Sequence, residues 1–413
     1  MRLGARLTNI LLRLLTMLSR FALIFFLARY FEPADLGLFG LLSATIGFAS
    51  LTLGGDYYTY SQRELISSPR NRWSFVLQHH FLALAILYVM LLPPQLLIFT
   101  VHLLPLNLMW WYFPILIIES LSQESSRFLI AMGMPVRANV VAFARSGFWI
   151  WLLLPTMLTH PTLRHLTLIF AAWLIGGMLS LLIAVRSLLH NLERSKWYSW
   201  DFKWLRRGFK TGLMFLFATF CFRGLTTVDR YAFRALSGYS LLGVYVFYLG
   251  LSMAIMNFLD AAVFAFTYPR MVSAHRAGDT KSYTNSLQEM SITTVTFASL
   301  LVLCILLFEP SVVKWTGRTI YGTHAHLLWI LLAATWAYAA SMIPHFALYA
   351  RGQDKAIFFA HVSSILIFFT TVLATTQFSP LFAPALGLLI AFLWLGLFKL
   401  LWYMRTTPIP IAA

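Results

Sequence analysis

The sequence has little charge, and most of that charge is of one sign. Only 11% of its 413 residues are Asp, Glu, Lys or Arg, whereas soluble domains carry about 25%. It contains 14 acidic residues, 31 basic residues and two cysteines. The low charge excludes an ordinary soluble domain. Both cysteines fall within apolar runs, which argues against a disulfide framework or a zinc site.

Motifs of several enzyme classes are also missing. The sequence contains no HExxH zinc-protease motif, no Walker-type glycine loop and no GxSxG nucleophile elbow. No stretch outside the apolar runs looks long enough to fold as a catalytic domain, and no soluble basic domain is available to bind nucleic acid. We therefore expect no enzymatic activity and no nucleic-acid partner.

Apolar runs long enough to cross a bilayer, roughly 20 residues each, fill most of the chain instead. Twelve can be marked: 7–30, 36–56, 75–101, 108–131, 137–158, 165–187, 210–233, 240–267, 287–308, 325–350, 356–376 and 382–404. The sequence therefore predicts an all-α polytopic membrane protein with about twelve transmembrane helices.

A basic and aromatic stretch, 188–209, divides these runs into two sets of six. We expect an N-terminal six-helix lobe (1–187) and a C-terminal six-helix lobe (210–413). The mixture of Trp, Lys and Arg between them is typical of a helix lying in the membrane interface.

Basic residues are distributed unevenly over the segments between the spans. With a cytoplasmic N-terminus, nineteen Lys and Arg residues fall in inner segments and four in outer segments. This positive-inside bias predicts a multi-pass protein with both termini in the cytoplasm. The same residues predict contact with anionic membrane lipids.

Two segments in corresponding places indicate that the lobes are repeats. ARYFEPADLGLFG (28–40) loosely resembles FRALSGYSLLGVY (233–245), with Gly37 matching Gly243. Each half begins inside and has six spans, so such repeats would be parallel, related by an axis along the membrane normal.

Eight basic residues lie inside the predicted spans, where one charge at a helix centre costs about 2.5–3.5 kcal/mol on insertion scales. Lys399 and Arg29 are near span ends, so their side chains are expected to snorkel to the headgroups. The other six are candidates for an anion-binding cavity, because guanidinium groups match phosphate oxygens and remain charged. They are Arg13, Arg20, Arg127, Arg145, Arg223 and Arg230.

Two spans present such arginines on one helical face. In the first span the face consists of Asn9, Arg13, Thr16 and Arg20, spaced four, three and four residues apart. The seventh span repeats the spacing of seven residues with Arg223 and Arg230. Arg13 could instead reach the inner headgroups, so Arg20 is the stronger candidate.

Five carboxylates in or near the spans could bind a coupling proton or sodium ion, and no other cofactor and no metal site is predicted. They are Asp56, Glu119, Glu124, Asp229 and Asp260. Neutralisation of Arg127 by a carboxylate of its own span is an equally good interpretation of that residue. His79 and His80, near the inner end of the third span, are expected to lie at the membrane interface.

Four stretches occur together in a recognisable order: ARYFEPADLGLFG (28–40), GGDYYTYSQREL (54–65), TTVDRYAFRALSGYSLLGVYVFYLGLSMA (226–254) and YPRMVSAHRAGD (268–279). In sequence and spacing they resemble the polysaccharide-biosynthesis flippases, in particular the O-antigen (Wzx-type) branch. One departure is Glu32, which stands where that family usually has glycine before Pro33.

This resemblance implies the fold of the multidrug/oligosaccharidyl-lipid/polysaccharide (MOP) superfamily, with two six-helix lobes around a central cavity. It implies transport of an undecaprenyl-diphosphate-type lipid-linked oligosaccharide, an O-antigen or exopolysaccharide repeat unit for lipopolysaccharide or related glycans. Movement would be from the cytoplasmic to the periplasmic leaflet of the bacterial inner membrane by alternating access. A polysaccharide polymerase and a chain-length regulator would be partners.

Three alternatives remain at this stage. A cation-coupled exporter of the same superfamily would prefer carboxylates to arginines in its lobes. A lipid II flippase usually has fourteen helices, two more than are predicted here. A membrane glycosyltransferase or polymerase would need a long outer loop with catalytic residues, and the predicted outer loops are short.

Overall fold

The structure is a computed structural model that describes residues 3–192 and 198–406. Within these residues every regular element is a helix. The prediction of an all-α membrane protein is confirmed. The long, predominantly apolar helices follow from the composition, because a backbone in lipid must satisfy its hydrogen bonds internally.

The helices are gathered in two compact units. The first unit consists of Met1–Phe31 and Phe39–Phe220, and the second of Glu32–Leu38 and Cys221–Ala413. The division falls within the long helix α10 (Phe202–Leu259), later in the chain than the predicted linker.

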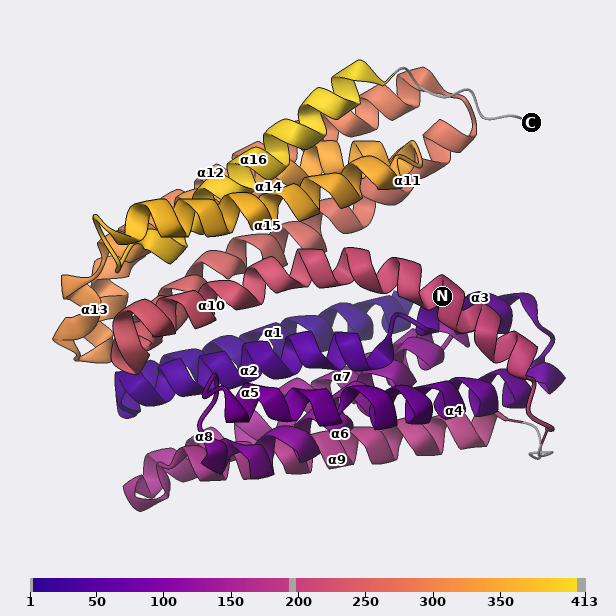
Figure 1. Cartoon of the computed structure of the whole chain (residues 1–413), viewed down its shortest axis with the longest axis horizontal. Coiled ribbons are helices and arrows are strands. Elements are labelled where there is room, and N and C mark those ends of the chain that lie inside the picture. The colour runs from indigo at the N-terminus through magenta and orange to yellow at the C-terminus, as the bar shows by residue number, and fades with distance from the viewer. Residues whose placement is uncertain (1–2, 193–197, 407–413) are drawn as a thin grey trace. The chain divides into compact units, whose positions relative to one another are not determined.

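The first unit contains nine helices and the start of α10 among its described residues (Figure 1). The nine are α1 (Leu3–Tyr30), α2 (Pro33–Gly54, whose residues up to Leu38 belong to the second unit), α3 (Tyr58–Ser67), α4 (Trp73–Leu91), α5 (Leu97–Thr100), α6 (Met109–Ala131), α7 (Pro135–Phe143), α8 (Trp149–Thr159) and α9 (Leu166–Asn191). The helix α6 packs on α7 and α9, and α7 also packs on α1.

The second unit contains the rest of α10 and six further helices (Figure 1). They are α11 (Ala265–Arg276), α12 (Thr280–Thr316), α13 (Thr319–Thr323), α14 (His326–Ala350), α15 (Asp354–Thr376) and α16 (Ala383–Arg405). The helix α16 packs along both α14 and α15.

Ten helical segments of the described chain are long and apolar enough to cross a membrane. They account for the twelve predicted spans once two differences are considered. The helix α6 has spanning length but a polar second half with Glu119, Glu124 and Arg127. In addition, one segment of 54 residues, Arg223–Arg276, contains the second part of the seventh span and all of the eighth.

A glycine separates the seventh and eighth spans. Gly238 interrupts α10 with φ 78° and ψ −179°, a conformation that is essentially restricted to glycine. The two predicted spans therefore exist as the two parts of α10, on either side of this residue.

The segment 188–209 is not one helix. The helix α9 ends at Asn191, residues 198–201 are not helical, and α10 begins at Phe202. Residues 193–197 of the predicted interfacial helix lie outside the described residues. The non-helical part is held to α4, because Gln78 exchanges hydrogen bonds of 2.9 and 3.1 Å with the Tyr198 backbone.

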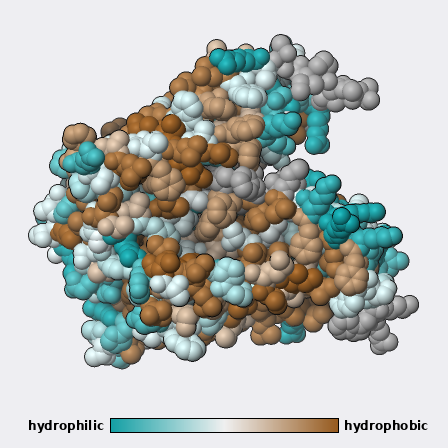
Figure 2. All heavy atoms as spheres, viewed as in Figure 1, coloured by the Kyte–Doolittle hydropathy of each residue, from teal (hydrophilic) through white to brown (hydrophobic). Residues whose placement is uncertain are grey.

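Large apolar side chains are exposed on many spans, for example Leu182 on α9 at 66% and Leu373 on α15 at 72%. Figure 2 shows hydrophobic residues over much of the visible surface. Exposed apolar surface of this extent is expected for helices whose solvent is lipid.

Candidate functional site

The polar face predicted for the first span is present on α1, and two of its residues contact the fifth span. Asn9 Oδ1 accepts a hydrogen bond of 2.8 Å from Asn139 Nδ2. Arg20 Nη2 donates one of 3.2 Å to Ser146 Oγ. Both Arg13 and Arg20 are exposed. The hydrogen-bond partner of Arg20 is thus a neutral hydroxyl.

Arg145 precedes Ser146 on a π-helical turn, Ala144–Phe148, between α7 and α8. Such turns are rare in proteins, and those that occur are often found at functional sites. Arg145 Nε lies 3.3 Å from Glu119 Oε1, and the two side chains are 13% and 16% exposed. Trp173 Nε1 donates to the other oxygen of Glu119 at 3.3 Å. Arg20 is within electrostatic range of both charges, so one carboxylate serves two arginines.

Loss of the Glu119 charge is expected to destabilise the first unit. Glu119→Gln leaves the half-buried Arg145 without an anionic partner, which should lower the free energy of unfolding by about 1–3 kcal/mol. The exposed pair Arg270–Glu289 provides a control, because Glu289→Gln should cost about 1 kcal/mol or less. Thermal unfolding of both variants in the same detergent would compare them, and equal shifts would contradict a buried role for Glu119.

Glu124 is the centre of a second polar group in the first unit. The side chain is 1% exposed, and its Oε1 accepts a hydrogen bond from Arg127 Nη1. Its Oε2 lies 3.4 Å from His80 Nε2 on α4. The interpretation that a carboxylate of its own span neutralises Arg127 is confirmed. The Arg127 guanidinium also lies 3.7 Å from the centre of the Tyr58 ring, a cation–π contact.

His79 and His80, expected at the membrane interface, are both fully buried within the first unit. His79 Nε2 accepts a hydrogen bond of 2.9 Å from the Asp201 N–H, and His80 Nδ1 lies 3.0 Å from Ser61 Oγ. The helix α3 and the segment before α10 therefore cover this end of α4. That covering is tertiary and has no local sequence pattern.

Asp56 lies in a tight turn directly after α2, beside the Glu124 group. Its φ of 47° is uncommon for a residue other than glycine, and its side chain is 3% exposed. Such backbone strain clusters at functional sites. Gly54 opens the turn, and a Cβ at this position would lie 2.8 Å from Glu124 Oε1. The absence of a side chain at Gly54 therefore allows Glu124 to pack against the turn.

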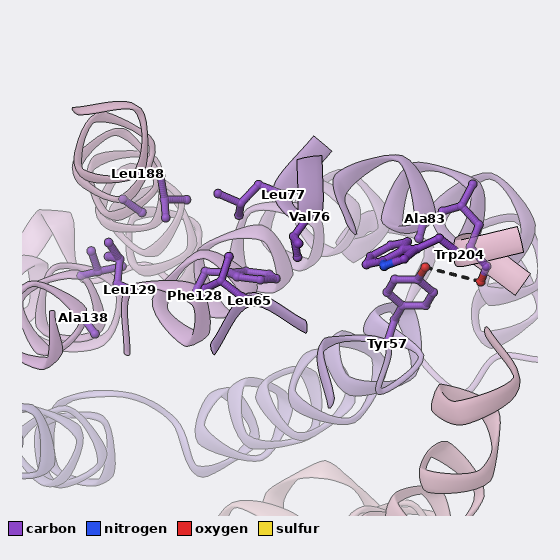
Figure 3. Packing of buried hydrophobic residues seen from close by; sticks show 13 residues of the cluster. Tyr57, Leu65, Val76, Leu77, Ala83, Phe128, Leu129, Ala138, Leu188 and Trp204 are labelled. Carbon is purple, nitrogen blue, oxygen red and sulfur yellow. Dashed lines mark hydrogen bonds between the residues drawn. The ribbon is translucent and has the colours of Figure 1, made fainter. Parts of the chain in front are cut away.

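Tyr57 fixes the same turn in a buried apolar cluster (Figure 3). Its ring centre lies 6.0 Å from that of Trp204, and its hydroxyl donates to the Leu205 carbonyl oxygen at 3.4 Å. Burial raises the pKa of Tyr57 well above its usual range, so the hydroxyl remains a donor at neutral pH. Phe128, the residue after Arg127, belongs to this cluster. The cluster thus holds the Arg127 end of α6 in place.

In the second unit, the adjacent residues Asp229 and Arg230 have different surroundings. Asp229 is buried and accepts a hydrogen bond of 2.8 Å from the Tyr245 hydroxyl. The Tyr245 ring stacks on Phe233, with ring centres 4.4 Å apart. Arg230 is half-buried, and its Nη1 donates to the Thr226 carbonyl oxygen at 2.9 Å. Asp229 therefore has a clear structural partner inside the helix bundle.

Arg223 and Asp260 resemble the Arg20 group in one respect. Asp260 begins a second π-helical turn, Asp260–Phe264, between α10 and α11. Arg223 is within electrostatic range of Asp260 and of Tyr338 on α14. Both Arg223 and Asp260 are exposed. Each unit thus has a π-helical turn next to an arginine of its first long helix.

The prediction that Lys399 snorkels to the headgroups is wrong. Its side chain is fully buried, and within the described residues Nζ has no hydrogen-bond partner. Lys399 is within electrostatic range of His345 on α14 and His361 on α15, whose ring centres are 6.1 Å apart. Because α16 packs along both helices, the lysine stem points into the bundle.

The structure therefore assembles some of the predicted site residues and separates others. Glu119 groups with Arg20 and Arg145, Glu124 with Arg127, and Asp260 with Arg223. Arg13, Asp56, Asp229 and Arg230 belong to none of these three groups. Among the partners that sequence reasoning missed are His80, Ser146, Trp173 and Tyr338. They are polar residues without a spacing pattern that links them to the arginines.

No protein-family profile and no curated protein matches the sequence. Solved structures match over nearly its full length. An inward-facing multidrug-resistance MATE transporter of the MOP superfamily aligns with a TM-score of 0.77 and 14% identity, covering 96% of this chain and 97% of the other. The lipid II flippase MurJ, in an inward closed conformation, aligns with a TM-score of 0.70 and 15% identity, covering 98% and 88%.

A MOP-superfamily transporter from Pyrococcus furiosus, described as having a binding pocket of reversed polarity, aligns with a TM-score of 0.60 and 13% identity. That alignment covers 96% of this chain and 94% of the other. The chain thus has the MOP-type fold, as predicted. At such identities the similarity establishes the fold alone, and function must be argued from the site.

Proposed function

We propose that this chain is a flippase that moves a polyprenyl-diphosphate-linked oligosaccharide from the cytoplasmic to the periplasmic leaflet by alternating access. The observation that carries this proposal is the environment of Arg20. It is exposed near the middle of α1, donates to the neutral Ser146, and shares the Glu119 carboxylate with Arg145. Two guanidinium groups therefore share one carboxylate, which leaves a positive charge that favours an anionic ligand. A diphosphate provides oxygens that match the guanidinium group.

The remaining arginines extend the same role. Arg13, Arg127, Arg145, Arg223 and Arg230 are proposed diphosphate contacts, and Asp56, Glu119, Glu124, Asp229 and Asp260 are proposed coupling-ion sites. The cargo would be an O-antigen or exopolysaccharide unit, passed to a polymerase and a chain-length regulator. The chain would be a transporter without catalytic residues, in the bacterial inner membrane, with both termini cytoplasmic.

A lipid II flippase is the second candidate, because MurJ shares the fold. A cation-coupled drug exporter is the third, because MATE transporters share it too. The arginine groups disfavour the exporter, since they would repel a cationic drug.

Reconstitution in liposomes tests the proposal. Purified protein should move a fluorescent undecaprenyl-diphosphate oligosaccharide between leaflets, measured by quenching of the outer leaflet with dithionite. The monophosphate-linked analogue should move more slowly, because it offers fewer oxygens to the arginines. Ethidium serves as the cationic comparison. Transport of ethidium without movement of the diphosphate lipid would overturn the proposal in favour of an exporter.

A further inference from the structure

Two buried polar atoms of the first unit face each other without forming a hydrogen bond. His80 Nε2 lies 3.4 Å from Glu124 Oε2, and the side chains are 0% and 1% exposed. Within the described residues, neither atom has a hydrogen-bond partner. Burying polar atoms in this state is costly, because their lost hydration is not replaced.

The surroundings of His80 suit its doubly protonated form. An imidazolium donates from both ring nitrogens. Nε2 faces the Glu124 carboxylate, and Nδ1 lies 3.0 Å from Ser61 Oγ. The Ser61 hydroxyl can in turn donate to the Tyr57 carbonyl oxygen, 3.3 Å away. A proton on His80 would therefore complete a continuous set of hydrogen bonds, with a charge-assisted one to Glu124.

Glu124 is shared between two basic groups. One carboxylate oxygen accepts from Arg127, and the other faces His80. Arg127 is 19% exposed, whereas Glu124 and His80 are closed off from solvent. An anionic ligand can thus reach the guanidinium but neither of the other two groups.

We propose that His80 and Glu124 form a proton-binding site whose occupancy determines how firmly Arg127 is held and so how strongly it binds an anionic headgroup. The inference rests on the proposed function for its choice of a diphosphate ligand. Without the proton, Glu124 and Arg127 neutralise each other. With the proton bound, the three groups carry one net positive charge, and the Glu124 carboxylate interacts with both His80 and Arg127. Proton and anion therefore favour each other's binding, by the same factor in both directions.

Apart from Asp56 in the adjoining turn, which both the wild type and His80→Gln retain, the groups around His80 and Glu124 supply no competing charge. The Tyr57 ring lies 5.7 Å from the His80 ring, and Tyr88 of α4 is near Glu124. Both are phenols, which are neutral around pH 7. Phe81 and Phe128 pack on the imidazole with ring centres 5.5 and 4.5 Å from it. The charged group in contact with His80 is thus Glu124, which in turn contacts Arg127.

Binding of inorganic diphosphate to the purified full-length protein tests the inference. Affinity is measured by tryptophan fluorescence at about pH 5.5 and pH 8, a range in which histidine changes charge. At the lower pH, the wild type should bind diphosphate about three- to tenfold more tightly than His80→Gln does, which corresponds to a modest coupling. Comparison with the variant cancels the titration of diphosphate itself. His345→Gln, a buried histidine of the second unit, should behave like the wild type.

Two further variants keep the test informative if His80→Gln folds poorly. Glu124→Gln removes the carboxylate that restrains Arg127, so at pH 8 this variant should bind diphosphate more tightly than the wild type does. Arg127→Gln should weaken binding at both pH values and remove the gain at low pH.

A gain at low pH that persists in His80→Gln or Arg127→Gln would overturn the inference, as would absence of diphosphate binding to the wild type. Failure of the proposed function looks different. Diphosphate would bind with the His80-dependent gain, but the lipid-linked oligosaccharide would not move in liposomes.

Discussion

Arg20→Ala is expected to abolish export of the lipid-linked oligosaccharide while the protein remains in the membrane. The residue is exposed and its hydrogen bond goes to a neutral serine, so truncation leaves no buried charge unpaired. The expected loss is a hydrogen bond to a charged ligand, about 1.5–3 kcal/mol, which corresponds to at least about tenfold in transport. Surface glycan in cells lacking the native gene would report transport, and immunoblots of membranes would report the protein.

Matched variants separate charge from geometry. Arg20→Lys keeps the positive charge but loses the planar guanidinium group that can bond two phosphate oxygens, so this variant should export at an intermediate level. Arg186→Ala, at an exposed arginine of α9, should leave surface glycan unchanged. Arg230→Ala should resemble Arg20→Ala, because the Arg230 Nη1 hydrogen bond goes to a backbone oxygen and the neighbouring Asp229 keeps its hydrogen bond from Tyr245. Normal glycan in both alanine variants, or loss of the protein from membranes, would contradict the diphosphate role.

The sequence predicts those features that depend on local spacing. Bilayer length and apolar composition are properties of a single run, so the twelve spans could be marked without tertiary information. The pairing of Arg127 with Glu124 could be predicted, because residues three apart are neighbours on one helix face. The polar face with Asn9 and Arg20 could be predicted for the same reason, although its partners on the fifth span could not.

The remaining features depend on which helices pack together. Lys399 lies near the end of its span in sequence, but α14 and α15 enclose it. His80 is near the start of its span, yet Ser61 of α3 and Glu124 of α6 surround it. Glu119 is paired with Arg145, from the next span, rather than with a residue of its own helix. Hydrophobic periodicity contains no information on such long-range contacts, nor on the π-helical turn that carries Arg145.

Gly243→Ala is expected to prevent accumulation of folded protein. The start of α2 contacts the second part of α10 backbone to backbone in the second unit. A Cβ at Gly243 would lie 1.8 Å from the Pro33 carbonyl oxygen, and one at Gly37 would lie 2.3 Å from the Tyr239 carbonyl oxygen. Small residues allow such close approach of membrane helices. Overpacking usually costs about 1–3 kcal/mol, and a backbone obstacle places this variant at the upper end or beyond.

Gly47→Ala on the same helix α2 is the control, because a Cβ there meets no atom within 4 Å. It should unfold at about the wild-type temperature, whereas Gly243→Ala and Gly37→Ala should unfold at lower temperature or fail to reach the membrane. Wild-type thermal unfolding of Gly243→Ala would contradict the backbone contact. Gly37 and Gly243 are also the residues matched between the two predicted repeats. If the two alanine variants destabilise the chain equally, the matched glycines have the same role. Each lacks the Cβ that would hold two helices apart.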